Sequence, residues 1–214
     1  MKKRYRKGIL FVISAPSGTG KTTLARRLTE QVPDLQFSIS HTTRSPRANE
    51  REGEDYFFVS PEQFKEMIEH DEFLEWAEVL GNYYGTSRSF VERWIHQGID
   101  LILDIDTQGA KKVKQRGLEA VLIYLLPPSF QCLQERLIRR GLDSDEQIQY
   151  RLAHARKDME EAFGFHYVVL NDQMEEALET LKAIVLAERC RREKEGMLHQ
   201  ILDQWEVGYG KNHR

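Results

Sequence analysis

Three short apolar segments without polar alternation recur along the chain: Ile9 to Ile13, Leu101 to Ile105 and Val121 to Leu126. An uninterrupted run of this length is typical of a strand covered on both faces, the usual situation in a parallel sheet. Segments with helical patterning follow the three runs, at residues 21–31, 107–115 and 129–140. This alternation of buried strand and helix predicts an α/β fold with a parallel sheet between layers of helices.

A fourth strand is expected at Tyr167 to Leu170, followed by a long amphipathic helix from about Gln173 to Lys194. Apolar residues recur along that helix with its own period, and charged residues lie opposite them. The tail beyond the helix carries a second apolar stripe, formed by Leu198, Ile201, Leu202 and Trp205. The stripe suits either the core or a second subunit, so a homo-oligomer through the C-terminal helices is left open.

Two segments interrupt the strand and helix pattern. Residues 40–98 contain polar loops, the alternating runs DYFFV and FLEWAEVL, and a turn at GNYYG, which together indicate an inserted small domain. Residues 134–157 surround the acidic turn RRGLDSDE with basic side chains and indicate a charged, movable flap. The expected organisation is a core of residues 1–39, 99–133 and 158–214, an insert of residues 40–98 and a lid of residues 134–157.

Composition narrows the class of protein. A chain of 214 residues with 40% hydrophobic content is long enough to bury a substantial core. The formal charge of −3 argues against a nucleic-acid partner, and no stretch reaches the roughly 18 apolar residues that span a bilayer. Cys132 and Cys190 lie far apart, so no disulfide framework is indicated and the cytoplasm is the expected location.

The stretch SAPSGTGKTT at residues 14–23 matches the phosphate-loop pattern G-x-x-x-x-G-K-[ST], with Ala15 at the first glycine position. Gly18 and Gly20 allow successive backbone N–H groups to point at one phosphate. Lys21 is suited to bridging terminal phosphates, and the Thr22 hydroxyl to joining a Mg²⁺ shell. A nucleoside triphosphate is therefore expected on a loop whose contact set is Ala15, Pro16, Ser17, Gly18, Thr19, Gly20, Lys21, Thr22 and Thr23.

The segment LILDIDTQG places Asp104 and Asp106 at the end of an apolar strand. The carboxyl ends of parallel strands border the ligand crevice of an α/β sheet. Residues two apart start on opposite sides of a strand, so the two aspartates are expected to serve different partners, one facing metal-bound water and the other the substrate. The alternative is a pair that simply caps the next helix.

Several motifs together resemble those of the guanylate kinase family. They are SAPSGTGKTT, SISHTTRSPR, GEDYFFV, FLEWAEV, GNYYGTS, LILDIDTQG, LPPS, ERLIRRG and LND, in that family's order and approximate spacing from residue 9 to about 190. The phosphate loop alone is unspecific, whereas TTRxPR followed by GNYYGT and LDID is highly specific. The resemblance implies a P-loop core with an inserted GMP-binding subdomain and a helical lid, and transfer of the ATP γ-phosphoryl group to GMP.

The resemblance also implies residue roles on the acceptor side. Arg44 and Arg47 would hold the GMP phosphate, for which the planar guanidinium fork is well suited, with Tyr56 and Tyr84 adding hydroxyl donors. Glu75 would read guanine, because a carboxylate accepts both N1–H and the exocyclic amine, whereas adenine presents a lone pair at N1. The remaining members of the base pocket would be Ser40, Gly85, Thr86 and Asp106.

On the donor side, the resemblance assigns the lid arginines Arg136, Arg140 and Arg151 to the transferred phosphoryl group, together with Lys21 and Arg44. Asn171 would lie near the adenine of ATP. Positioning and charge neutralisation dominate such a reaction, and no general base is required.

Rival interpretations come from other classes of protein. Guanylate-kinase-like modules of scaffold proteins bind peptides without catalysis, but they typically lack an intact phosphate loop. A GTPase is suggested by DTQG, which fits D-x-x-G, yet the chain has no N-K-x-D tetrapeptide to read guanine. Kinases of AMP or pyrimidine nucleotides would differ only at the base pocket.

Overall fold

A five-stranded parallel sheet forms the centre of the core in this computed structural model, which describes residues 7–79, 81–141 and 144–211. The strands lie in the order β2 (Leu35–Phe37), β7 (Asp100–Asp104), β1 (Leu10–Ser14), β8 (Ala120–Leu126) and β9 (Tyr167–Leu170), and every neighbouring pair is parallel. The predicted strands at all four apolar runs are therefore confirmed.

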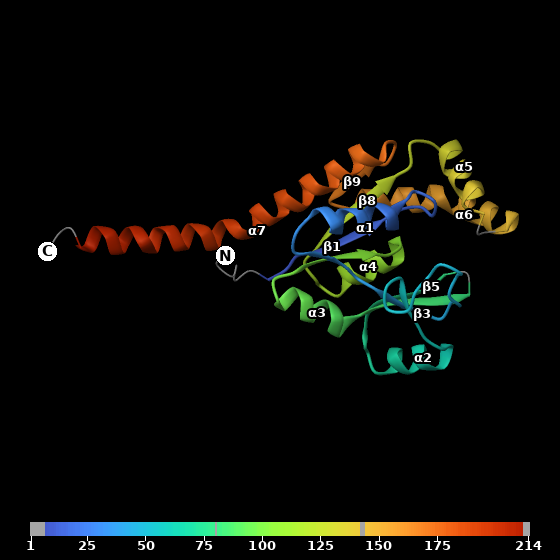
Figure 1. Ribbon diagram of the computed structural model, residues 1–214, viewed down its shortest axis with the longest axis horizontal. Helices are drawn as coiled ribbons and strands as arrows, with labels where there is room; N and C mark the ends of the chain where they lie inside the picture. Colours follow the sequence, from blue (N-terminus) through green and yellow to red (C-terminus); the bar gives the residue numbers. More distant parts are fainter. Residues whose placement is uncertain (1–6, 80, 142–143, 212–214) are drawn as a thin grey trace.

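Both faces of this sheet are covered by helices, which explains the missing polar alternation (Figure 1). Helices α1 (Lys21–Gln31) and α7 (Met174–Lys211) pack on the face that carries Phe11 and Ile13. Helices α3 (Arg88–His96) and α4 (Thr107–Gln115) cover the opposite face, which carries Leu10 and Val12. The predicted α/β class with helices on both sides is confirmed, and α1 and α4 have the expected bounds.

Helix α7 extends further than its sequence pattern predicted. It continues past Lys194 and through Gly196 to Lys211, because helical apolar spacing persists in the tail. Figure 1 shows its C-terminal half leading away from the rest of the molecule, and Leu198, Ile201, Leu202 and Trp205 are all more than half exposed. The alternative in which this stripe packs on the core is therefore wrong.

A buried ion pair joins α7 to the start of two strands. Asp100 is fully buried at the first position of β7, where its Oδ1 accepts a hydrogen bond from the Ile9 N–H at 2.7 Å. Its Oδ2 accepts from Nε of Arg189 on α7, also at 2.7 Å. A second nitrogen of Arg189 donates to the Pro33 carbonyl at 2.8 Å, so the α1 to β2 turn is held by the same side chain.

A second sheet lies in the predicted insert, with strand order β4, β3, β6 and β5. Its elements are β3 (Ser40–Thr42), β4 (Tyr56–Phe58), α2 (Pro61–Glu69), β5 (Phe73–Val79) and β6 (Asn82–Ser87). The runs DYFFV and FLEWAEVL supply β4 and β5 as predicted. GNYYG differs from the prediction: only Gly81, with φ of 75°, makes the turn, and the following residues form β6.

Two helices make up the predicted flap region, α5 (Phe130–Arg140) and α6 (Asp145–Glu160). Leu133, Leu137, Ile148, Leu152 and Ala155 form a small apolar cluster between them, so the basic residues occupy only part of each helix surface. A short 3₁₀ helix, η1 (Glu161–Gly164), leads from α6 towards β9. Within the described ranges, we find no helix with the length and apolar content needed to cross a bilayer.

Candidate active site

The phosphate loop connects β1 to α1, and its glycines have the backbone conformation that the sequence pattern predicted. Gly18 and Gly20 both have φ of 92°, in the left-handed region that favours glycine. Ala15 is not among the residues with positive φ, so an alanine fits that position without strain. Gly20 precedes α1 without any side-chain cap, and the first turn has no acidic residue. The positive end of α1 is therefore available to an anion.

Three side chains from α1 and β7 meet beside this loop. Nζ of Lys21 lies 2.7 Å from Oδ1 of Asp104 and donates to the Ile105 carbonyl at 2.6 Å. The Thr22 hydroxyl donates to Oδ2 of Asp104 at 2.5 Å. Thr22 and Asp104 thus bring together the hard oxygen donors that suit Mg²⁺, which takes one or two carboxylates and completes its shell with phosphate and water. Among the described residues, no group of three or more His, Cys, Asp or Glu forms a metal site.

Asp106 has the capping position that the sequence left as an alternative. Its Oδ1 accepts a hydrogen bond from the Gly109 N–H at 2.8 Å, at the start of α4. Its charge is nonetheless close enough to raise the pKa of Glu75. Asp106 therefore borders the predicted base pocket while it caps a helix.

Residues from the lid and Asn171, which directly follows β9, hold the phosphate loop in place. Nδ2 of Asn171, a buried residue, donates to the Thr19 carbonyl at 2.6 Å, and Arg136 donates to the same carbonyl at 3.3 Å and to the Asn171 carbonyl at 3.1 Å. Arg151 donates to the Ser17 hydroxyl at 2.6 Å. Two of the three predicted lid arginines thus touch the phosphate loop, while the side chain of Arg140 lies outside the described residues.

The predicted acceptor-phosphate residues converge between β3, β4 and β6. Nε of Arg44 donates to the Tyr84 hydroxyl at 3.2 Å, and its guanidinium carbon lies 5.5 Å from the centre of the Tyr56 ring. The Tyr56 and Tyr84 rings are 6.0 Å apart. Burial, assisted by the negative charge of Asp104, raises the pKa of Tyr56 to about 12. The Tyr56 phenol therefore stays protonated at neutral pH and remains a hydrogen-bond donor.

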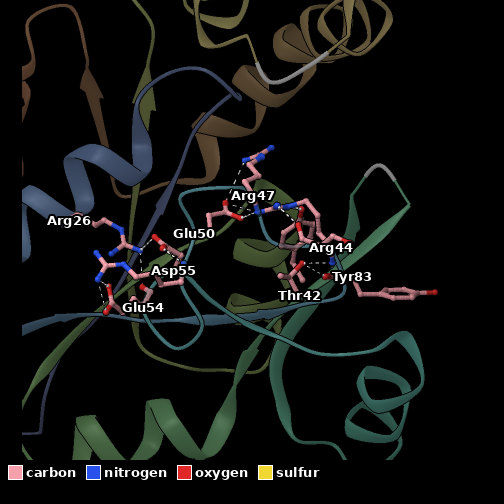
Figure 2. A network of polar contacts seen from close by, with 11 residues as sticks. Arg26, Thr42, Arg44, Arg47, Glu50, Glu54, Asp55 and Tyr83 are labelled. Atoms are coloured by element: carbon pink, nitrogen blue, oxygen red, sulfur yellow. Dashed lines mark hydrogen bonds and ion pairs between the residues drawn. The ribbon is translucent and has the colours of Figure 1, made fainter.

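Glu50 belongs to this cluster, although the sequence did not single it out (Figure 2). One Arg44 nitrogen donates to both of its carboxylate oxygens, at 2.8 and 2.9 Å, and the Arg47 backbone N–H donates at 2.9 Å. Burial alone would raise the pKa of Glu50, but the hydrogen bonds from Arg44 and Arg47 lower it below its usual value. No spacing rule marks a glutamate in a polar loop, so the sequence carried no signal for it.

The predicted base reader, Glu75, is buried where the insert packs against α4. It lies on β5 with only 4% of its surface exposed, and its cross-strand neighbour Thr86 donates a hydroxyl hydrogen bond to it at 2.5 Å. A Cβ atom added to Gly109 would lie 2.7 Å from its Oε2, so the carboxylate rests directly on the first turn of α4. Burial, with the nearby charge of Asp106, raises the pKa of Glu75 to about 7.

The other predicted pocket residues contribute in different ways. Ser40 is half-buried at the start of β3, opposite Tyr56 in the ladder. A Cβ atom on Gly85 would lie within 3 Å of the Phe73 and Phe64 rings, so Gly85 allows these rings to pack beneath β6. Lys112, which the sequence did not single out, lies with Nζ 4.4 Å from the centre of the Trp76 ring, and its charge lowers the pKa of Glu75.

Comparison with known proteins agrees with this geometry. A family model described as guanylate kinase matches residues 7–188. A guanylate kinase of Geobacter sulfurreducens is 50% identical over 186 residues, which cover 87% of this chain and 92% of the relative. One of Geobacter metallireducens is 46% identical over 203 residues, which cover 95% and 99%. The crystal structure of guanylate kinase from Anaplasma phagocytophilum superposes with a TM-score of 0.72 at 34% identity, covering 86% of this chain and 87% of that one. The chain therefore belongs to the guanylate kinase family of nucleoside monophosphate kinases.

Proposed function

We propose that the chain transfers the γ-phosphoryl group of ATP to GMP in a Mg²⁺-dependent reaction, giving ADP and GDP. The observation that carries this proposal is the buried Glu75 carboxylate, which accepts a hydrogen bond from Thr86 and packs against the first turn of α4. A buried carboxylate needs hydrogen-bond donors, and the N1–H and amine of guanine supply two. GMP therefore completes a site that would otherwise hold a costly buried charge.

Donor binding is assigned to the phosphate loop and the lid. The backbone N–H groups of residues 17–20 and the start of α1 would bind the phosphates, and Lys21 would neutralise charge that develops on the transferred group. Thr22 and Asp104 would hold Mg²⁺, whose chemistry when bound is to neutralise phosphate charge. Arg136 and Arg151 support the role of the lid in donor binding, because both contact the phosphate loop. Arg140 is assigned the same role. The lid, residues 134–157, would exclude water from the reacting phosphates.

Acceptor binding is assigned to the subdomain of residues 40–98. Arg44 and Arg47 would pair with the GMP phosphate, and Tyr56 and Tyr84 would donate hydroxyl hydrogen bonds to it. The attacking phosphate oxygen is already anionic, so alignment with the ATP γ-phosphorus is the main requirement. Ser40, the Gly85 backbone, Thr86 and Asp106 would surround the base next to Glu75.

Steady-state kinetics with GMP, dGMP, AMP, UMP and CMP, each with ATP and Mg²⁺, test this proposal. Turnover is expected with GMP and, because no 2′-hydroxyl reader is assigned, also with dGMP. No ADP release with ATP, Mg²⁺ and GMP would contradict the proposal and favour the non-catalytic scaffold class. A preference for AMP or a pyrimidine nucleotide would instead contradict the role of Glu75.

The biological setting follows from this reaction as part of the same proposal. GMP phosphorylation serves purine nucleotide salvage and recycling in the cytoplasm, with GMP and ATP as partners and no nucleic acid or membrane. The exposed stripe of α7 supports a homo-oligomer through the C-terminal helices. Sedimentation of the full chain tests that association, and a Leu202→Glu variant is expected to weaken it.

A further inference from the structure

We propose that Arg26 is a positioning residue that fixes the acceptor-phosphate loop, residues 43–55, against the helix that begins at the phosphate loop. The inference deepens the proposed function and rests on it. Nothing in the motifs marks Arg26, which the sequence alone presents as one of two adjacent arginines in a helix. Its contacts with the insert distinguish it from its neighbour.

Arg26 crosses from α1 to the end of the acceptor-phosphate loop (Figure 2). One of its terminal nitrogens donates to the Glu54 carbonyl and to Oδ1 of Asp55, both at 2.9 Å. Its guanidinium carbon lies 4.9 Å from the centre of the Phe37 ring, which restricts the side chain from the other side. The guanidinium therefore has three partners, and its contact to Asp55 is only partly exposed to water, with 37% and 29% of the two side chains accessible.

On the donor side, Arg26 shares a helix face with the candidate metal ligand. Residues four apart lie one above the other on an α-helix, so Thr22 and Arg26 face the same way. Thr22 is itself fixed by its 2.5 Å hydrogen bond to Asp104. The position of Arg26 is consequently set by the same helix turn that carries Lys21 and Thr22.

On the acceptor side, Asp55 is integrated into the loop that it anchors. Its Oδ2 accepts from the Arg51 backbone N–H at 2.9 Å, and its own N–H donates to the Arg51 carbonyl at 3.0 Å. The next residue, Tyr56, has its ring against the guanidinium of Arg44. A displacement of Asp55 is therefore transmitted directly to the residues proposed to hold the GMP phosphate.

Arg26 therefore connects the donor side, through the helix that carries Lys21 and Thr22, to the acceptor side, through Asp55. The phosphates bound on these two sides must align for in-line transfer. A solvated ion pair would contribute little to either stability or catalysis. A contact that sets the distance between the donor and acceptor phosphates acts instead on the reaction rate, because a misplacement of the reacting groups by about 1 Å can lower that rate about 100-fold. The proposed role therefore predicts a kinetic loss much larger than the loss of stability.

The test compares Arg26→Ala with Arg27→Ala in steady-state kinetics and thermal unfolding. Arg27 is a matched control, because it lies on the same helix but pairs at 2.7 Å with Glu175 on α7 instead of with the insert. Arg26→Ala is expected to lower kcat/KM for GMP by about 10-fold or more, while KM for ATP stays within about twofold. Arg26→Lys, which keeps the charge, should recover part of the loss, and Arg27→Ala should leave kcat/KM for GMP near wild type.

Asp55→Asn and the Arg26→Ala/Asp55→Asn double variant supply an independent measurement. If the two residues act as one link, their effects on kcat/KM for GMP overlap, and the double variant is little worse than Arg26→Ala. Additive effects, an Arg26→Ala variant that matches Arg27→Ala, or an equal rise in KM for ATP would each overturn the inference. If Arg26→Ala does not fold, Asp55→Asn is judged by the same criterion. A wild-type protein without GMP-dependent turnover would instead refute the proposed function.

Discussion

Replacement of Glu75 by glutamine removes the charge of the proposed guanine reader while it keeps the size of the side chain. Glutamine offers one amide oxygen and an NH₂ group in place of two acceptor oxygens, so its NH₂ group would face one of the two guanine donors. A donor left unpaired in a buried site costs about 1–3 kcal/mol, which corresponds to a fall of about 5- to 150-fold in kcat/KM for GMP. The preference for GMP over AMP should decrease by a similar factor.

The same substitution has a separate effect on folding, because the pKa of Glu75 is raised to about 7 from a usual 4.5 by burial. A carboxyl group with a raised pKa in the folded state stabilises the fold fully below about pH 4.5, and that contribution is lost as the pH rises towards 7. At 1.36 kcal/mol per pKa unit, the loss is about 3 kcal/mol. Glutamine does not titrate, so the variant gains that amount relative to wild type across the same window.

Chemical denaturation at about pH 4.5 and about pH 8 measures the folding effect, and competition kinetics between GMP and AMP measures the base preference. Glu78→Gln is the matched control, since Glu78 lies on the same strand but is exposed. Two outcomes would refute the reasoning. An unchanged GMP to AMP ratio would exclude Glu75 as the reader, and a variant whose stability tracks wild type at both pH values would exclude the raised pKa.

Three further substitutions have defined outcomes. Lys21→Ala should lower kcat by about 100-fold or more without unfolding the chain, because it removes charge stabilisation at the transferred phosphoryl group; full ADP release from a folded variant would exclude the phosphate-loop role. Gly109→Ala should lower kcat/KM for GMP by about 10- to 100-fold, since its Cβ would lie 2.7 Å from Oε2 of Glu75, and near-normal GMP kinetics would show that the carboxylate can shift freely. Arg189→Met should cost about 3–5 kcal/mol in denaturant unfolding, because the buried Asp100 charge loses its guanidinium; a loss below about 1 kcal/mol would show that this ion pair is not needed.

The core strands were predictable because their signal is local. A strand buried on both faces needs an unbroken apolar run, so the sequence alone predicts β1, β7 and β8. The helices that flank them are predicted by the helical spacing of apolar residues after each run. The start of helix α2 is also marked in the sequence, since Ser60 and Gln63 form a capping box around Pro61. Strand β6 was missed because Gly81 before it marks a turn, and the residues Asn82–Ser87 behind the turn contain no apolar run.

The candidate site was only partly predictable, because its motifs indicate which residues take part but not which residues they form hydrogen bonds or ion pairs with. Lys21, Thr22 and Asp104 were expected together, and the structure joins them. The hydrogen bond from Asn171 to the Thr19 carbonyl joins residues 152 positions apart, and no pattern within either segment indicates it. Glu50 and Arg26 are ordinary charged residues in the sequence, and only tertiary placement gives them partners.

The ion pair between Asp100 and Arg189 has a consequence for how the chain is made. Strand β1 emerges first from the ribosome but lies in the middle of the sheet, between β7 and β8. The carboxylate that holds the Ile9 N–H obtains its guanidinium only when residue 189 has been translated. Burial of Asp100 before that point would leave its charge unneutralised, so the nascent chain gains the full stability of its core only after residue 189 has been translated.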